Sequence, residues 1–277
     1  MATPLIELPP ALRQPEDYKA IFEGVESALV QTGAERMPAE QIRRCLDEWK
    51  HYETRELHDD DYHRILVEVV FYSGFRAATV TSKLPIIHAH FPGYKATASY
   101  GEDQIERILH DPAMIKNRVK VNACVENARA FAAIVAKYGS FVAYINSYRP
   151  RESAANLDRL RCDVDQNFKG LGKITSYHFL TEIGMPVLKP DRVIKRIFTR
   201  LGLVNGTASE EDCVAAGHKF VEATGHPIRY IDFVFVAYGQ VQTLEVGLEH
   251  GICLKDRPFC CLCGVTTYCA HFKANRG

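Results

Sequence analysis

The cysteines near the C-terminal end constrain this chain more than any other feature. Five of its nine cysteines lie between residues 253 and 269, whereas the other four are scattered along the sequence. A secreted disulfide framework would distribute its cysteines throughout a short chain. Their concentration in one segment of a 277-residue chain therefore favours a metal site built by a single loop.

Four of these cysteines are the candidate ligands: Cys253, Cys260, Cys263 and Cys269, with gaps of six, two and five residues. Thiolates hold iron–sulfur clusters, and four of them complete a cubane cluster. Zinc is the alternative, since four cysteines also suit a tetrahedral ion. However, zinc sites usually combine two short Cys-x2–4-Cys pairs, and only one pair here has that form. We expect a 4Fe–4S cluster, with Cys261 as a non-ligand.

The rest of the chain has the periodicity of helices. Apolar residues recur at helical spacing in several segments, and glycine and proline separate these segments. Strand-like alternation is scarce. The segments expected to be helical are 62–72, 115–137, 140–147, 153–165, 190–203, 209–223 and 228–240. The sequence therefore predicts a mostly α fold.

Charge and hydropathy restrict the partners and the compartment. Lys plus Arg and Asp plus Glu both number 34, so any binding to nucleic acid must rest on local charge. Residues 1–18 show no basic segment followed by an apolar run, which argues against a signal peptide. No uninterrupted apolar stretch approaches the roughly 18 residues of a membrane span. We expect a cytoplasmic protein with no membrane partner.

A second motif lies in the middle of the chain, where Gly170, Leu171 and Gly172 precede Lys173, Ile174, Thr175 and an apolar helix. Two glycines around one apolar residue allow a tight turn between helices and expose N–H groups at a helix N-terminus. Such groups bind phosphate without a side chain. A simple turn between helices is the alternative.

An aspartate follows this motif at the start of a basic helix. Asp191 stands after Pro190, in a position where an aspartate is usually an N-cap. Between residues 169 and 200 the seven basic residues outnumber Glu182 and Asp191, which gives a net charge of +5. These basic residues are Lys169, Lys173, Lys189, Arg192, Lys195, Arg196 and Arg200.

The order of hairpin, aspartate and cysteine loop resembles the helix-hairpin-helix DNA glycosylases. The run HGICLKDRPFCCLCGVTTYCAHF is similar to the cluster loop of endonuclease III and the adenine-mismatch glycosylases, including the proline two residues before the second ligand. Together the motifs cover about the C-terminal 110 residues. The resemblance implies two helical lobes. A six-helix barrel would comprise residues 58–182 with the hairpin, and residues 1–57 and 183–277 would form the iron–sulfur cluster domain.

The resemblance also implies roles for individual residues. Asp191 would be the catalytic carboxylate, which stabilises the positive charge that grows on the sugar as the base leaves. Members that also cut the DNA backbone carry a lysine where this chain has Ile174, so we expect a monofunctional glycosylase. Its partner would be double-stranded DNA with a damaged or mispaired base, bound by a nucleoid-associated monomer. The implied DNA-binding residues are Gly170, Leu171, Gly172, Lys173, Thr175, Phe75, Arg76 and Arg192.

The segment from Asp59 to about Tyr148 looks like the 3-methyladenine DNA glycosylase I group. It departs from that group at Ser73, where the group has a carboxylate, and it lacks the group's zinc pattern. An alkylated purine is the first expected substrate, followed by uracil, hypoxanthine or mispaired thymine. A non-catalytic module that binds DNA lesions remains open. Basic residues at 116, 118 and 120 fit either phosphate contacts or a solvated helix face.

Overall fold

The computed structural model describes residues 14–275, and this part of the chain is mostly helical. Within these residues the only β-pairing is an isolated bridge between Thr243 and Leu248. The predicted α class is confirmed. Most of the segment used above to argue against a signal peptide, residues 1–13, lies outside the described residues.

The chain divides into two compact units, with boundaries between residues 54 and 55 and between residues 185 and 186. Unit 1 combines the residues before the first boundary with those after the second. Unit 2 is the continuous segment 55–185. The sequence placed the boundaries a few residues away, at 57/58 and 182/183. Assigning a six-helix barrel to the central segment and a metal cluster to the other stays a prediction.

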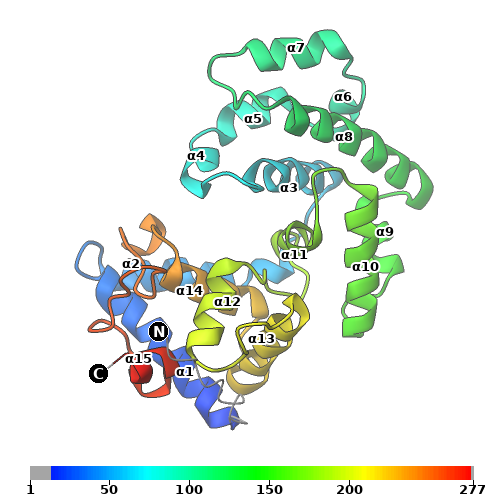
Figure 1. The fold of residues 1–277 in the computed structure, drawn as a ribbon. Coiled ribbons are helices and arrows are strands. Elements are labelled where there is room, and N and C mark those ends of the chain that lie inside the picture. Colours follow the sequence, from blue (N-terminus) through cyan, green and yellow to red (C-terminus); the bar gives the residue numbers. More distant parts are fainter. Residues whose placement is uncertain (1–13, 276–277) are drawn as a thin grey trace, which may run out of the picture. The chain divides into compact units, whose positions relative to one another are not determined.

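Unit 1 is built from helices at both ends of the chain (Figure 1). Aromatic rings fill its core, where Phe22, Phe198, Phe220 and Phe235 pack edge-on or tilted against one another. Its helices are α1 (Pro15–Gly33), α2 (Ala39–Lys50), α12 (Arg192–Arg200), α13 (Glu210–Thr224), α14 (Ile228–Gly239) and α15 (Ala270–Ala274).

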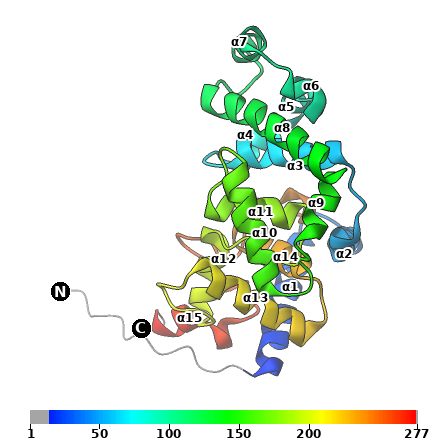
Figure 2. The same ribbon diagram turned by 90° about the vertical axis from the view of Figure 1, so that its right-hand side faces the viewer.

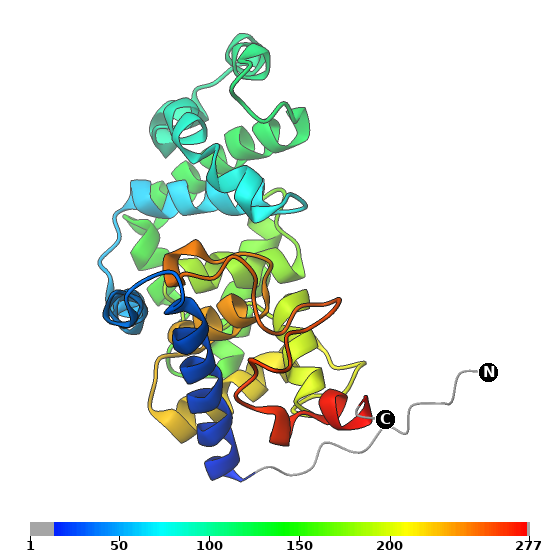
Figure 3. The same ribbon diagram turned by 90° about the vertical axis from the view of Figure 1, so that its left-hand side faces the viewer.

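The cysteine-rich loop packs directly on α1, because Gly264 and Val265 of the loop lie against Gly24 of this helix. Figure 3 shows the C-terminal segment beside α1, which is drawn in blue. Glycines on both sides permit this approach. A Cβ atom at Gly264 would lie 2.4 Å from the carbonyl oxygen of Gly24, and one at Gly24 would lie 2.7 Å from a methyl group of Val265. Both distances are far below van der Waals contact, so neither position accepts a side chain without movement of the backbone.

Unit 2 contains the remaining helices, and Figure 2 shows α9, α10 and α11 of this unit. Its longest helix is α8, which packs along α3 and α6. The helices are α3 (Asp59–Tyr72), α4 (Ala77–Thr81), α5 (Leu84–His90), α6 (Tyr94–Ala98), α7 (Glu102–His110), α8 (Arg118–Tyr138), α9 (Phe141–Ser147), α10 (Ala154–Asn167) and α11 (Lys173–Glu182). Across residues 14–275 no single helix is long and apolar enough to span a membrane, although α8 and α9, bent by 72°, meet both criteria when taken together.

Side-chain caps explain where five of the predicted helices begin, whereas α3 and α14 begin without one. Each capping oxygen accepts a backbone N–H group of the first helical turn, which would otherwise lack a partner. Helix α8 starts at Arg118, three residues later than predicted, because the side chain of Asn117 accepts the Lys120 N–H. The other capping residues are Ser140, Ser153, Asp191 and Ser209. Periodicity alone did not delimit α1, α2 or the short helices α4–α7.

One buried histidine in unit 2 makes its stability dependent on pH. The His63 ring is fully buried against the rings of Phe131 and Tyr94, and neither ring nitrogen has a hydrogen-bond partner among residues 14–275. Burial lowers the pKa of His63 to about 4, although the nearby Asp60 opposes the shift. The imidazole is therefore neutral in the folded protein at neutral pH.

We expect the free energy of unfolding to decrease as the pH falls from about 6.5 to about 4. In this window the unfolded chain binds a proton at His63 and the folded chain does not, so the loss is about 3 kcal/mol. Above pH 6.5 the contribution is constant. Denaturant unfolding across this range should show a flatter profile for His63→Leu than for the wild type. Replacement of the exposed His110 by leucine is the control, and equal profiles for all three proteins would contradict the prediction.

Candidate active site and cysteine pocket

The hairpin in unit 2 forms a tight turn before α11. Gly170 has a φ of +77°, in the left-handed region that favours glycine. Leu171 packs against the core of this unit. The side chains of Lys169, Lys173 and Ile174 are exposed. The motif thus presents two basic side chains beside a helix N-terminus.

Two hairpin residues differ from the sequence interpretation. Gly172 has a φ of −135°, which any residue adopts, and a Cβ atom there would meet nothing closer than 4.0 Å, so the turn itself does not require the second glycine. Thr175 acts within the protein, because its hydroxyl accepts the Gly172 N–H at 2.6 Å and donates to the Gly172 carbonyl. One of the N–H groups expected to bind phosphate is therefore already bonded.

Asp191, in unit 1, is the N-cap of α12. Its Oδ1 accepts the backbone N–H groups of Val193 at 2.7 Å and Ile194 at 3.2 Å. Its Oδ2 lies 3.8 Å from the ammonium group of Lys189. The positive end of the helix dipole stabilises a carboxylate at this position. The side chain is thus a fixed anion with one oxygen occupied by the backbone.

A second carboxylate anchors the turn that carries Asp191. Asp232, on α14, is only 2% exposed and accepts the Lys189 N–H at 3.0 Å. Burial raises the pKa of Asp232 to about 6, although its ion pair with Arg229 at 2.7 Å opposes the shift. The Arg229 guanidinium also lies over the ring of Trp49 at 4.5 Å. No sequence pattern indicates the contact of Asp232 with Lys189, because the two residues lie 43 positions apart.

The basic segment is less available to a ligand than its net charge indicated. On α12, Lys195 pairs with Glu210 at 3.0 Å. Arg196 donates to the carbonyls of Gly239 and Cys253, and Arg200 donates to those of Leu254 and Lys255. These three charges hold unit 1 together. Arg192, by contrast, is exposed.

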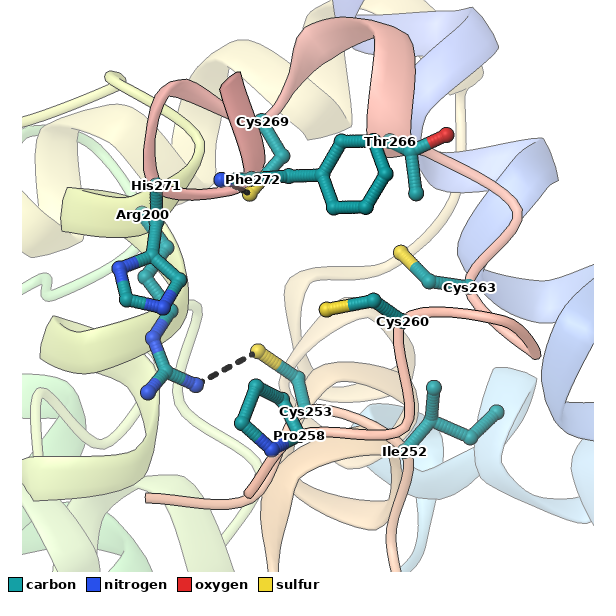
Figure 4. A pocket seen from close by; sticks show the side chains of 10 residues that line it. All are labelled: Arg200, Ile252, Cys253, Pro258, Cys260, Cys263, Thr266, Cys269, His271 and Phe272. Atoms are coloured by element: carbon teal, nitrogen blue, oxygen red, sulfur yellow. Dashed lines mark hydrogen bonds between the residues drawn. The ribbon is translucent and has the colours of Figure 1, made fainter. Parts of the chain in front are cut away.

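The four predicted cysteine ligands line one pocket in unit 1. Figure 4 shows the sulfur atoms of Cys253, Cys260, Cys263 and Cys269 directed into the same space. The rest of the wall is lined by Arg200, Ile252, Pro258, Thr266, His271 and Phe272. The exposed Cys261 does not line the pocket. The spacing of the cysteines therefore identified residues that converge.

Three of the four sulfur atoms accept hydrogen bonds. The donors are the Tyr238 hydroxyl to Cys263 at 2.9 Å, the Arg200 guanidinium to Cys253 at 3.3 Å and the Phe272 N–H to Cys269 at 3.3 Å. Such donors stabilise thiolates and tune metal centres. Within residues 14–275, however, no group of three or more His, Cys, Asp or Glu side chains is placed so that it could hold a metal ion.

The predicted DNA-inserting residues lie in the loop after α3. Phe75, 38% exposed, and Arg76, also exposed, follow Gly74. Of the three nearby basic residues, Arg118 pairs with Glu102 and Glu106, whereas Lys120 is half-buried. The exposed Arg118 is compatible with the expected solvated helix face, whereas Lys120 makes internal contacts.

Sequence reasoning missed an acid–base pair in unit 2. Glu68 on α3 lies 2.8 Å from the Nε2 atom of His88 on α5. Burial raises the pKa of Glu68, and the negative charge of Glu182 acts in the same direction, while His88 and Arg64 oppose it. The spacing of the two histidines at 88 and 90 was visible in the sequence, but their carboxylate partners were not.

Comparison with known proteins agrees with this architecture. The family model described as methyladenine glycosylase matches residues 47–167. A structure of an endonuclease III–DNA covalent intermediate is similar with a TM-score of 0.55 and 18% identity, over 85% of this chain and 97% of the other. The 8-oxoguanine DNA glycosylase of Thermotoga maritima is similar with a TM-score of 0.50 and 17% identity, over 79% of this chain and 95% of the other. A 3-methyladenine DNA glycosylase I has a TM-score of 0.42 and 22% identity, over 48% of this chain and 82% of the other. The chain has the helix-hairpin-helix DNA glycosylase fold.

Proposed function

We propose that this chain, which folds as helix-hairpin-helix DNA glycosylases do, hydrolyses the N-glycosidic bond of a damaged base in duplex DNA. The observation that carries the proposal is the carboxylate of Asp191 at the start of α12. Two backbone N–H groups fix its Oδ1, which leaves Oδ2 for chemistry. A fixed anion of this kind suits a reaction in which positive charge develops.

The chemistry follows from the charge that a departing base leaves behind. The target nucleotide must leave the base stack before its glycosidic bond is accessible. As that bond breaks, positive charge grows on the sugar, and the Asp191 carboxylate stabilises it. The same carboxylate orients a water molecule for attack at C1′. Asp232 supports this role by holding the backbone of Lys189, two residues before Asp191.

An alkylated purine such as 3-methyladenine is the proposed substrate. The match of residues 47–167 to the methyladenine glycosylase family supports this choice. Such bases carry positive charge and leave readily, so one well-placed carboxylate supplies much of the stabilisation. Uracil, hypoxanthine and mispaired thymine are the competing substrates within the same reaction class.

Base release under single-turnover conditions tests the proposal. Duplexes carrying one lesion each (3-methyladenine, hypoxanthine, uracil or a G·T mispair) are incubated with excess protein, and abasic sites are detected by cleavage in alkali. Release from the alkylated duplex above all others is the expected result. If every duplex is bound and none is cleaved, the chain is a lesion-binding module and the glycosylase proposal is wrong.

We expect no covalent intermediate with abasic DNA. The position of the lyase lysine is Ile174, which is exposed and has no amine. The amine beside Asp191 belongs to Lys189, which lies 3.8 Å from the Asp191 carboxylate and not at the position of the lyase lysine. Borohydride should therefore trap no adduct with abasic DNA. An adduct that disappears in Lys189→Met would contradict the expectation and identify the amine.

We also propose that the cysteine pocket holds a 4Fe–4S cluster. Thiolates are the ligands of such clusters, and four of them complete a cubane cluster. The four sulfurs share one pocket, and their spacing contains only one of the two short Cys-x2–4-Cys pairs that zinc sites usually combine, which supports the cluster over zinc. When bound, the cluster would cross-link the loop to itself. Arg200 and Tyr238 would then hold their sulfur partners in place.

A further inference from the structure

Helix α8 carries two polar side chains that form hydrogen bonds with neighbouring loops in unit 2. Lys120 and Asn127 are seven residues apart, which is close to two helical turns, so they lie on the same face of α8. One contacts the end of α3 and the other contacts the hairpin. Both loops contain residues that the resemblance to helix-hairpin-helix DNA glycosylases assigns to DNA binding.

Lys120 holds the loop that contains Phe75. Its ammonium group donates to the carbonyl oxygens of Val70 and Ser73 and lies 5.4 Å from the centre of the Phe75 ring. Carbonyls at a helix C-terminus lack intrahelical partners and attract a cation. The ring adds a cation–π contact. Burial lowers the pKa of Lys120, and all of these contacts are internal.

Asn127 holds the hairpin from the same helix. Its side-chain amide is only 1% exposed and makes two hydrogen bonds to one residue, donating to the Lys169 carbonyl at 2.9 Å and accepting the Lys169 N–H at 2.6 Å. Lys169 directly precedes Gly170. A Cβ atom at Gly170 would lie 3.6 Å from Val70 and 3.7 Å from Ala123, so the turn rests against α3 and α8.

We propose that Lys120 and Asn127 are positioning residues that set the exposed Phe75 wedge in register with the phosphate-binding hairpin. This inference rests on the proposed function. Its ligand is duplex DNA with a gap in the base stack, where an inserted ring recovers stacking that the missing base has lost. A wedge that is already rigid binds without the cost of ordering a loop.

The two residues should affect binding differently. Lys120→Met keeps the apolar stem but releases the loop, so it should lower the preference for a gapped stack. Asn127→Ala releases the hairpin, so it should weaken binding to every duplex because phosphate contacts are independent of sequence and damage. Lys120→Arg restores a cation that can donate to both carbonyls, and it should recover most of the preference.

Affinity measurements on two duplexes, across a range of salt concentrations, test the proposal. One duplex is undamaged and the other contains a tetrahydrofuran abasic-site analogue. Lys120→Met should reduce the ratio of the two affinities about tenfold, in line with the stacking of one ring on a base. The salt dependence should not change, because the Lys120 ammonium is not at a phosphate. Lys116→Met, which removes an exposed charge next to α8, is the matched control.

Different results overturn different claims. A uniform loss of affinity in Lys120→Met, with a salt slope lower by about 0.9, would make Lys120 a phosphate contact and overturn its positioning role. If Lys120→Met retained the wild-type preference and Asn127→Ala retained the wild-type affinity for both duplexes, the inference would be overturned and the proposed function would remain intact. A wild-type protein with no preference for the abasic duplex would overturn both.

Discussion

Replacement of Cys253 or Cys263 by serine is expected to yield a colourless, destabilised protein, whereas Cys261→Ser should remain as brown as the wild type. The first two sulfurs point into the cysteine pocket and accept hydrogen bonds from Arg200 and Tyr238 (Figure 4). Cys261 is exposed and does not line the pocket. The three variants therefore remove the same atom type from positions only a few residues apart.

The expected effect is large because binding of the proposed cluster would be coupled to the folding of this loop. Residues 251–275 contain only short helical turns and pack on unit 1 partly through Cys253, Cys263 and Cys269 themselves. The free energy of metal binding then contributes to the free energy of unfolding, and for structural zinc it reaches about 10–16 kcal/mol. A loss of even 4 kcal/mol would lower the Tm by about 10 °C, which thermal unfolding measures directly.

Elemental analysis separates the possible metals. Iron and acid-labile sulfide in the wild type and in Cys261→Ser, with both absent from the other variants, is the expected result. If the protein contained one zinc ion per chain and had no colour, the pocket would hold a mononuclear zinc site and the cluster proposal would be wrong. If Cys253→Ser, Cys263→Ser and Cys261→Ser all behaved as the wild type does, no metal would bind in the pocket.

The sequence predicted the helices well because helix formation is largely local. Apolar periodicity and a capping residue such as Ser140 or Ser209 lie within one segment, and both are visible without any tertiary information. The cysteine loop was predictable for the same reason, since its candidate ligands lie within 17 residues of one another. Helices α4–α7 are short, and their ends are set by tertiary packing rather than by a repeated pattern.

The supporting residues of the site were not predictable, because each acts across a long sequence separation. Asn127 binds Lys169 from 42 residues away, and Asp232 binds Lys189 from 43 residues away. A periodic pattern indicates that a residue faces the core but not which backbone group it meets there. Arg196 and Arg200 were wrongly counted as charge available to DNA. Both side chains donate hydrogen bonds to carbonyls of the cysteine loop instead.

Asp191→Asn should abolish most base release while leaving the protein folded and able to bind DNA. Loss of one electrostatic or general-base group costs about 10²- to 10⁴-fold in rate. Asparagine caps a helix about as well as aspartate, so its side-chain oxygen can still accept the Val193 and Ile194 N–H groups. The Tm should therefore change little, whereas the single-turnover rate constant falls by at least about 100-fold.

Asp191→Ala completes the comparison, because it removes the cap as well as the charge. It should release bases as slowly as Asp191→Asn, and it should also lower the free energy of unfolding by about 1 kcal/mol. If Asp191 is only a cap, Asp191→Asn should retain the wild-type rate constant. Asp191→Ala should then lose stability but not base release. Measuring the rate constant and the stability of the same three proteins thus separates the two roles of one carboxylate, whose Oδ1 serves the helix and whose Oδ2 is assigned to the reaction.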